Sequence, residues 1–342
     1  MIRAAIVGFG RWRKPVVRRM QGSRKLTFVA ALEASEVHAG FAAEQGLRVA
    51  ADWDDLLGDS SIDAVILCAP HAMQVHHVLA AAAAGKHVFC EKLPVPTSAE
   101  LSVDARRATD VVLRIGHECR LEPAATELRR MIRDGVLGAA VHAEASLSLD
   151  RLGSVPESGW WAPSADAPAA GMTAMGTDLT DLYLALFGPV TEIYARTAPR
   201  PSNRTLRGIA SIQMRFESGA TGYLGAVPGS PHYLRMAVFG TEAWVEVRNH
   251  AHSDVPSFMT LTYRHRNGYR DAIEFPWEDM MCRNLDAFAD AIERDSRDPG
   301  TDAQTIANRA MREAVCASAA GNMPIRIERS SEVRLRPVAA MA

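Results

Sequence analysis

Apolar residues recur in short blocks through the first third of the chain, and each block is followed by a stretch of helical spacing or by a glycine. The blocks lie at 4–7, 26–32, 63–68, 87–90 and 111–115, with a further one beginning at Val49. Strands that are apolar along their whole length and alternate with helices are typical of a parallel sheet covered on both faces. The pattern predicts a doubly wound α/β domain over residues 1–121.

The pattern changes after about residue 121. Between Ile212 and Phe216 every second residue is apolar, which is typical of a strand with one buried face. Ser218-Gly219 is a turn signal, and Asn267-Gly268 predicts a two-residue hairpin. Helices are expected over 123–134, around 285–292 and over 306–319. Residues 122–342 are therefore predicted to form an α+β domain with an open-faced, largely antiparallel sheet, whose free face a partner subunit would cover.

Length and composition fit two ordinary globular domains. The chain has 342 residues, of which 48% are hydrophobic and 23% charged, with a formal net charge of −2. The densest basic cluster lies between Arg11 and Arg19, and we interpret it as a helix face beside a phosphate site rather than a nucleic-acid footprint. The longest apolar run, Val78 to Ala84, is far shorter than the roughly 20 residues that cross a bilayer.

The cysteines and histidines indicate no metal site and no disulfide framework. The five cysteines are scattered, odd in number and never spaced as CxxC. Such spacing is typical of reduced thiols in a cytoplasmic protein. Met1 is followed almost at once by the first strand, so no signal peptide is expected.

A glycine-rich turn follows the first predicted strand and opens a helix. It reads Gly8-Phe9-Gly10-Arg11-Trp12-Arg13, with Arg13 where a third glycine often stands. Glycines at this point permit a tight turn and let the backbone approach a pyrophosphate at the helix N-terminus. Glu33 ends the second strand, where an acid accepts hydrogen bonds from the adenosine ribose. A carboxylate there repels a 2′-phosphate, so NAD is favoured, with NADP as the alternative.

Several segments together resemble the glucose–fructose oxidoreductase/inositol dehydrogenase/rhizopine catabolism (Gfo/Idh/MocA) family. They are Gly8-Phe9-Gly10, 62–65, Ala84 to Lys92, Gly116-His117 with Arg120 and Pro123, 171–181 and 186–189. The resemblance implies a Rossmann domain joined to an open-faced α/β domain. It also implies hydride exchange between NAD(P) and a secondary alcohol or ketone on a sugar or cyclitol, in dimers or tetramers that form through the open sheet.

The resemblance also assigns site residues. Lys92 is expected to transfer the proton together with Asp178, and Asp181 and Trp161 to join them at the substrate. The expected cofactor contacts are Gly8, Phe9, Gly10, Arg11, Trp12, Glu33, Ala69, Pro70, Glu91, Lys92 and Arg120. For Arg120, an interdomain salt bridge is an equal alternative. For Asp178 the alternative is a helix cap or an ion pair, and for Asp181 it is an orienting role.

Three positions depart from the family pattern. Leu93 follows Lys92 where the family has proline, and we expect a trans bond because a cis bond before a non-proline residue costs roughly 3 kcal/mol. Asp178 stands where the family has its histidine, and Ala174 where many members carry a further acid.

The aspartate changes the expected chemistry. Lys92 acts as a base only if its surroundings lower its pKa towards neutrality. An ionised Asp178 within about 4–6 Å would raise that pKa instead. The enzyme would then work mainly as a ketone reductase, or would have lost the activity. Two other functions stay open: a non-catalytic cofactor-binding protein, such as a sensor, and an NAD-assisted glycosidase.

Overall fold

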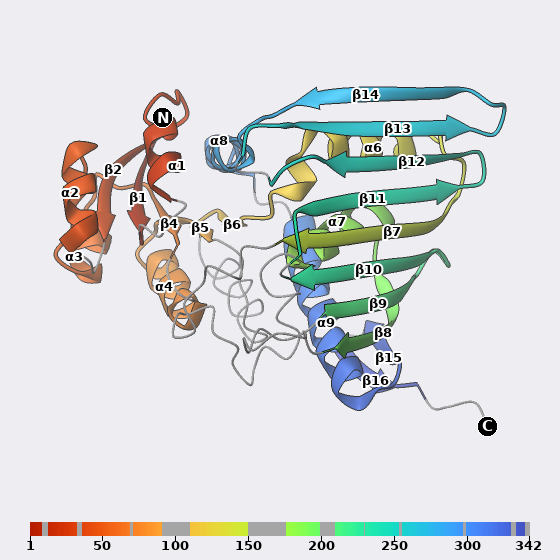
Figure 1. Ribbon diagram of the computed structural model, residues 1–342. Coiled ribbons are helices and arrows are strands. Elements are labelled where there is room, and N and C mark those ends of the chain that lie inside the picture. The colour runs from red at the N-terminus through yellow and green to blue at the C-terminus, as the bar shows by residue number, and fades with distance from the viewer. Residues whose placement is uncertain are drawn as a thin grey trace. The chain divides into compact units, whose positions relative to one another are not determined.

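The computed structural model describes most of the chain, as two compact units (Figure 1). The first unit contains residues 1–118 together with 279–305, and the second contains residues 119–278 and 306–342. The described residues are 1–8, 13–32, 36–68, 71–90, 110–149, 176–198, 209–228, 230–252, 255–296, 299–329 and 333–338.

The first unit is built on a six-stranded parallel sheet, as the block pattern predicts. Its strand order is β3-β2-β1-β4-β5-β6, which is the Rossmann order. The strands are β1 (Ile2–Val7), β2 (Leu26–Leu32), β3 (Arg48–Val49), β4 (Ala64–Leu67), β5 (His87–Cys90) and β6 (Leu113–Ile115). The order reverses between β1 and β4, and a crevice for a ligand forms outside the carboxyl ends of the strands at such a point.

Both faces of this sheet are covered by helices. Ile2, Ala4 and Ile6 join a cluster with α1 (Arg13–Met20) and α2 (Glu36–Glu44), whereas Ala5 and Val7 join a cluster on the opposite face. That second face carries α3 (Trp53–Gly58) and α4 (His71–Ala83). Strands buried on both faces explain why the apolar runs in the sequence are continuous rather than alternating.

One helix of the first unit comes from the far end of the chain. In α8 (Met280–Glu293), Leu285, Phe288 and Ala289 are fully buried in the cluster that contains α1 and α2. The Asp290 carboxylate pairs with the Lys25 Nζ at 2.8 Å. The sequence analysis placed this segment after the second sheet, in residues 122–342, whereas its burial groups it with the first unit.

The basic residues of α1 face neighbouring elements of the same unit. The Lys14 Nζ lies 5.1 Å from the centre of the Phe41 ring on α2, and the Arg18 guanidinium lies 5.2 Å from it. Arg19 pairs with Asp279, the N-cap residue of α8. Cation–π contacts and an ion pair therefore account for these three charges within the fold.

The second unit is built on a ten-stranded sheet. Its order is β14-β13-β12-β11-β7-β10-β9-β8-β15-β16, and its pairs are antiparallel except for β7 with β10. The strands are β7 (Ala140–Leu149), β8 (Val190–Ala198), β9 (Ile209–Phe216), β10 (Thr221–Pro228), β11 (Tyr233–Gly240), β12 (Ala243–Asn249), β13 (Phe258–His265), β14 (Arg270–Pro276), β15 (Ile325–Arg329) and β16 (Val333–Pro337). The open-faced, largely antiparallel sheet predicted for this part is confirmed.

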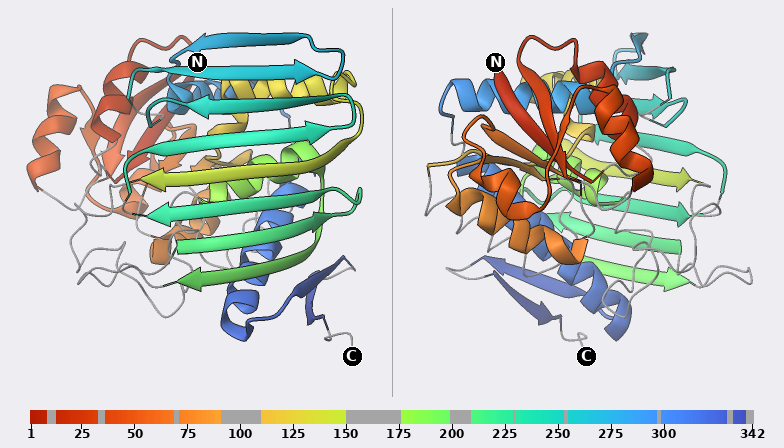
Figure 2. Two further views of the ribbon diagram at one scale, coloured as in Figure 1. Left: turned by 45° about the vertical axis from the view of Figure 1, so that its right-hand side comes forward. Right: turned by 90° about the vertical axis from the view of Figure 1, so that its left-hand side faces the viewer.

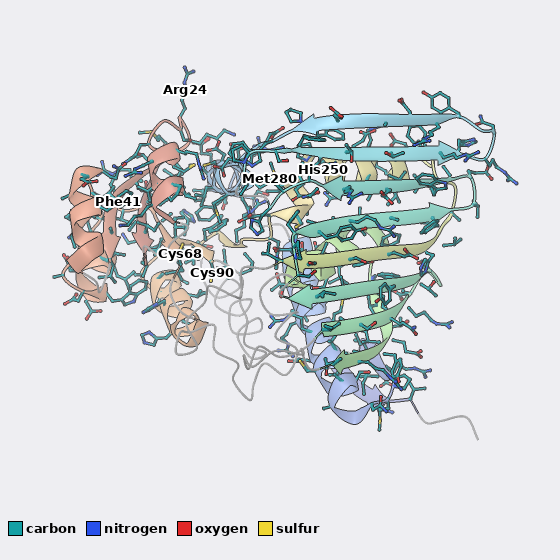
Figure 3. The ribbon with its side chains drawn as sticks, viewed as in Figure 1. Arg24, Phe41, Cys68, Cys90, His250 and Met280 are labelled. Carbon is teal, nitrogen blue, oxygen red and sulfur yellow. The ribbon has the colours of Figure 1, made fainter. Side chains whose placement is uncertain are left out.

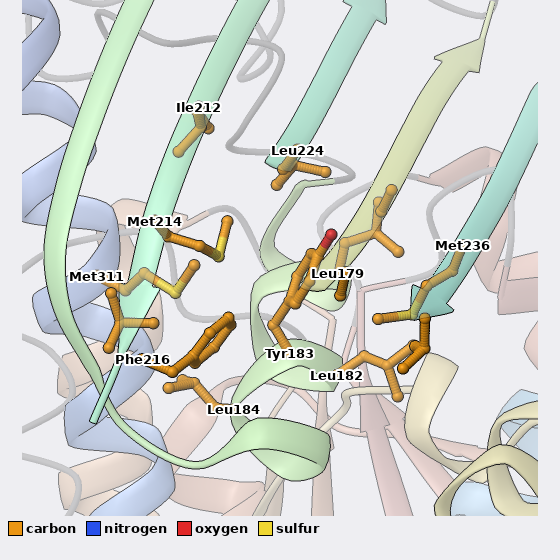
Figure 4. Close-up of a cluster of buried hydrophobic side chains, with 14 of the residues drawn as sticks. Leu179, Leu182, Tyr183, Leu184, Ile212, Met214, Phe216, Leu224, Met236 and Met311 are labelled. Atoms are coloured by element: carbon orange, nitrogen blue, oxygen red, sulfur yellow. The ribbon is translucent and has the colours of Figure 1, made fainter. Parts of the chain in front are cut away.

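Three helices lie on one face of this sheet: α6 (Pro123–Arg133), α7 (Thr177–Phe187) and α9 (Pro299–Gly321) (Figure 2, left). Figure 4 shows the core between them and the sheet, where Tyr183 of α7 packs among leucines and methionines from several strands. The Tyr183 hydroxyl donates a 2.6 Å hydrogen bond to the Tyr223 carbonyl on β10. Every side chain from Thr177 to Leu184 is buried, so α7 is an interior helix rather than an amphipathic surface helix.

The predicted turns form at their glycines, but one hairpin loop is a residue longer than predicted. Gly219, in the turn after β9, has φ 88° and Gly268 has φ 91°, a left-handed conformation that glycine adopts without strain. The His265 N–H donates to the Tyr269 carbonyl at 2.8 Å, which leaves three residues in the loop. The predicted two-residue hairpin is therefore wrong by one residue, because the chain uses a turn followed by a left-handed glycine.

The five cysteines all lie among the described residues and are present as thiols. Within the described part of the chain, no helix has the length and apolarity that a membrane crossing requires.

Candidate functional site

The carboxyl ends of the parallel strands form one aligned row. Val7 of β1 pairs in register with Leu32 of β2 and with Leu67 of β4. Leu67 pairs with Cys90 of β5, and Cys90 pairs with Ile115 of β6. Figure 3 labels Cys68 and Cys90, which lie at the ends of β4 and β5 in this row. The chain therefore leaves five neighbouring strands at the same edge of the sheet.

The predicted cofactor residues come directly after this row in the sequence. Gly8 follows β1 with φ 87°, and its N–H donates to the Leu32 carbonyl at 3.0 Å. This left-handed turn needs glycine, and it fits a backbone that approaches a dinucleotide. Of the remaining predicted contacts, Arg120 belongs to the second unit. The other predicted contacts and Trp161 lie outside the described residues: Phe9, Gly10, Arg11, Trp12, Glu33, Ala69, Pro70, Glu91 and Lys92.

In the second unit, α7 carries the two predicted acids. Asp178 and Asp181 are three residues apart, so they lie on neighbouring positions of one helix face. Asp178 lies in the first turn, where the helix dipole favours negative charge. Both side chains are buried, with 8% of Asp178 and 1% of Asp181 exposed. The spacing in the sequence thus brings two carboxyl groups into the interior of this unit.

Arg120 neutralises Asp181 by a two-point contact. Arg120 belongs to the short 3-10 helix η1 (Cys119–Leu121), and its Nε donates to Asp181 Oδ2 at 2.7 Å. Its Nη2 makes a second, short contact to Asp181 Oδ1. Both carboxylate oxygens are therefore engaged by one guanidinium. This pair lies within the second unit and not between the units, and it favours the orienting role for Asp181.

The start of α7 is also fixed by polar contacts to α9. The Thr180 Oγ1 donates to Asn308 Oδ1 at 2.6 Å, and the Asn308 Nδ2 donates to the Thr177 carbonyl at 3.3 Å. Thr180 and Asn308 are both buried. Buried hydrogen bonds of this kind hold the turn that carries Asp178 in one position.

Glu122 is a third buried acid, which the sequence analysis did not single out. It directly precedes Pro123 in the N-cap position of α6, which Ser, Thr, Asp or Asn usually occupies, and its side chain makes no capping hydrogen bond. Instead its Oε1 accepts a 3.2 Å hydrogen bond from the Asn249 Nδ2 at the end of β12. The position before a helix-starting proline was the available signal, but burial could not be read from it.

Burial raises the pKa of Glu122 to about 7; the Asn249 hydrogen bond opposes this rise, and the charge of Asp178 adds to it. A carboxyl group with this pKa is largely protonated at mildly acidic pH. The native state holds this proton more tightly than the unfolded chain does. The contribution of Glu122 to stability is therefore complete below about pH 4.5 and is lost as the pH rises to about 7.

Arg129 of α6 adds a second guanidinium to this region. Burial and the charge of Arg120 lower its pKa, and the charge of Asp181 raises it. Its Nε is buried and has no hydrogen-bond partner among the described residues. The site in the second unit thus contains the pair Arg120–Asp181, the neighbouring Arg129, and two acids, Asp178 and Glu122.

Two family models match this chain, one for each part of the fold. The first, described as "Oxidoreductase family, NAD-binding Rossmann fold", matches residues 2–117. The second, described as "GFO/IDH/MocA C-terminal domain", matches residues 125–246. The chain belongs to the Gfo/Idh/MocA oxidoreductase family. Its first unit is accordingly an NAD-binding Rossmann domain, and the family resemblance stated from the sequence is confirmed.

Individual relatives of this Gfo/Idh/MocA chain extend over nearly its whole length. It is 28% identical to the uncharacterized oxidoreductase YrbE of Bacillus subtilis, over 96% of the chain and 97% of the relative. It is 24% identical to scyllo-inositol 2-dehydrogenase (NAD(+)) of the same organism, over 96% of each. A solved levoglucosan dehydrogenase, in complex with NADH and L-sorbose, has the same fold, with a TM-score of 0.82 at 18% identity and coverage of 96% and 99%.

The buried ion pair between Arg120 and Asp181 predicts that replacing the arginine alone costs more stability than replacing both residues. Arg120→Gln removes the guanidinium from a carboxyl group that is 1% exposed, so we expect a loss of about 3–5 kcal/mol in the free energy of unfolding. Adding Asp181→Asn removes the stranded charge and recovers part of the loss. Urea unfolding monitored by circular dichroism measures both changes.

Arg130→Gln is the matched control, because Arg130 is an exposed arginine of α6 that pairs with Glu127 on the surface. It is expected to cost much less. An Arg120→Gln variant no less stable than Arg130→Gln would contradict the structural role of the pair.

Proposed function

We propose that this Gfo/Idh/MocA protein interconverts a secondary alcohol and a ketone on a sugar-like or cyclitol substrate, with NAD preferred over NADP. The observation that carries the proposal is the register of the parallel sheet. It aligns Cys90, two residues before Lys92, with the ends of the strands that precede Gly8, Glu33 and Ala69. The chain segments that contain Lys92 and the expected dinucleotide contacts begin at the ends of these neighbouring strands, which supports the proposal. Relatives named as inositol and levoglucosan dehydrogenases support the substrate class.

Lys92 is the proposed proton donor and acceptor. The nicotinamide, when bound, supplies the acceptor or donor of hydride. Lys92 takes the hydroxyl proton during oxidation and returns it to the carbonyl oxygen during reduction. Asp178 is proposed to work beside it, at the position where the family has histidine. Since an ionised Asp178 stabilises the lysine ammonium, ketone reduction is the favoured direction near neutral pH.

Glu33 is proposed to bind the adenosine ribose and so to set the cofactor preference. Charge-assisted hydrogen bonds of this kind are worth about 1.5–3 kcal/mol each. We therefore expect Glu33→Ala to weaken NADH binding by about tenfold or more and to narrow its advantage over NADPH. Isothermal titration calorimetry with both reduced cofactors measures this.

Glu44→Ala is the control for that experiment, because Glu44 is an exposed glutamate of α2. It is expected to leave both affinities unchanged. Failure of the parent protein to bind any nicotinamide dinucleotide would contradict the proposed function and favour a non-catalytic role.

Asp178 is proposed to control the pKa of Lys92. Asp178→Asn removes a negative charge, so the lysine should lose its proton more readily. We expect the rise of the alcohol oxidation rate with pH to move about one pH unit towards neutrality, measured as kcat/KM across a sugar and polyol panel. Asp134→Asn, at the exposed end of α6, should leave the profile in place. An oxidation profile that Asp178→Asn does not move would exclude this role for Asp178.

The uncovered sheet face is proposed to be a homo-oligomer interface. Ser146 of β7 alternates with the buried Ala145 and Leu147, so it lies on the face opposite the helices. Arg235 of β11 is its partner in register and pairs with Glu144 at 2.6 Å. Ser146→Arg places a bulky charge at the centre of this face and should give a monomer in sedimentation velocity. The turn variant Ser218→Arg should keep the oligomer, and a monomeric parent protein would exclude the interface.

A further inference from the structure

We infer that Glu122 is a positioning residue that keeps one proton beside Asp178, so that the two buried carboxyl groups carry a single negative charge between them when the site is ready to reduce a ketone. The inference rests on the proposed function and deepens it. It concerns a residue that lies between Arg120 and Pro123, two residues that carry the family resemblance, but is not itself one of them.

The position of Glu122 places its carboxyl group in the interior and not at the helix cap. The side chain is 5% exposed and belongs to the residue just before α6. Its Oε1 accepts from the Asn249 amide at 3.2 Å. Asn249 is itself buried and accepts, through its carbonyl, a contact from the His232 ring at 3.4 Å. The group of β12 that contacts the Glu122 carboxyl is therefore a neutral amide.

The charge that acts on the Glu122 carboxyl is a like charge, that of Asp178. On η1, Arg120 is engaged by both oxygens of Asp181. On α6, Arg129 interacts with Arg120 and Asp181. On α7, the charge of Asp178 reaches Glu122 and opposes its ionisation. Among the described residues, the polar groups that act on the Glu122 carboxyl are thus the Asn249 amide and the Asp178 carboxyl.

The charge of Asp178 opposes the ionisation of Glu122, so the two buried carboxyl groups are coupled electrostatically. Ionising both places two negative charges in an interior of low polarity, so one proton is retained until the pH rises to about 7. A protonated carboxyl group can donate a hydrogen bond, whereas an ionised one only accepts. We assign the proton to Glu122, because its side chain is 5% exposed and accepts a hydrogen bond from a neutral amide.

The retained proton matters for the proton balance of the reaction. Reduction transfers one hydride to the carbonyl carbon and one proton to the carbonyl oxygen, and water replaces that proton at the site. With Glu122 protonated, the pair carries one negative charge and holds a proton in reserve beside Asp178. With both groups ionised the reserve is gone, so reduction is expected to fall as the pH rises through about 7.

The test compares pH profiles of kcat/KM for ketone reduction. The parent enzyme should lose activity above pH 7, by about tenfold for each further pH unit. Glu122→Gln can still accept from Asn249 but has no proton to supply, so it should lower the rate below pH 7 and remove this fall. Glu122→Asp should restore a fall with a shifted midpoint, which a purely structural role would not predict. Glu127→Gln, on the surface of the same helix, should leave the profile unchanged.

A second readout needs no substrate and separates this inference from the proposed function. Titration of 13C-labelled glutamate carboxyl groups by NMR should show Glu122 changing charge near pH 7, with a lower midpoint in Asp178→Asn. A Glu122 midpoint near the ordinary value of about 4.5, or an inflection near pH 7 that persists in Glu122→Gln, would overturn the inference. A raised Glu122 midpoint in a protein that turns over no sugar or cyclitol would instead overturn the proposed function, while the inference that Glu122 keeps its proton would stand.

Discussion

The buried pair between Arg120 and Asp181 is the constraint on which the second unit depends. It joins the chain just before α6 to the helix α7, and Asp181 is almost completely removed from water. A carboxylate in that position is tolerable only with a bidentate partner, because a stranded buried charge is far more costly than an exposed one. The pair therefore fixes α7 against η1, and with it the position of Asp178. Its effect on overall stability is smaller, since a buried ion pair often stabilises a fold no more than well-packed apolar side chains in the same place would.

The pair between Arg120 and Asp181 also affects which groups act on the Glu122 carboxyl. Because Arg120 is engaged by Asp181, it does not neutralise Glu122, and Glu122 meets a neutral amide and the charge of Asp178. A family that uses histidine at the position of Asp178 would place a group there that titrates near neutral pH. In this chain burial raises the pKa of Glu122 to about 7 and the charge of Asp178 adds to the rise, which brings a carboxyl group into the same range. The proposed role of Glu122 therefore links Asp178 to a neighbouring acid.

The sequence predicted those features that depend on local pattern. Continuous apolar runs identified the parallel strands, and alternation identified the open sheet. Gly85, two residues after the end of α4, has φ 72°, the left-handed conformation in which a glycine commonly ends a helix. The family resemblance was sufficient to find Asp178, Asp181 and Arg120, but the pairing of the last two needed the structure.

Features that depend on tertiary contact were not predictable. The apolar face of α8 has helical spacing, yet spacing does not tell which sheet it packs on, and it packs in the Rossmann unit. The strands β15 and β16 at the end of the chain were missed, because they are short and rich in arginine. Glu122 resembles a helix cap in the sequence, and only its burial distinguishes it from one.

The central claim is that a nicotinamide at the edge of the parallel sheet exchanges hydride with a sugar-like carbon while Lys92 and the acids of the second unit manage the proton. The most direct measurement is isotope transfer. The protein is incubated with NADH deuterated at C4 and with a panel of ketoses and keto-inositols, and the alcohols are analysed by mass spectrometry. The account predicts deuterium on the carbon that carried the carbonyl group, and none with Lys92→Met. Bound NADH that transfers no deuterium to any member of the panel would contradict it.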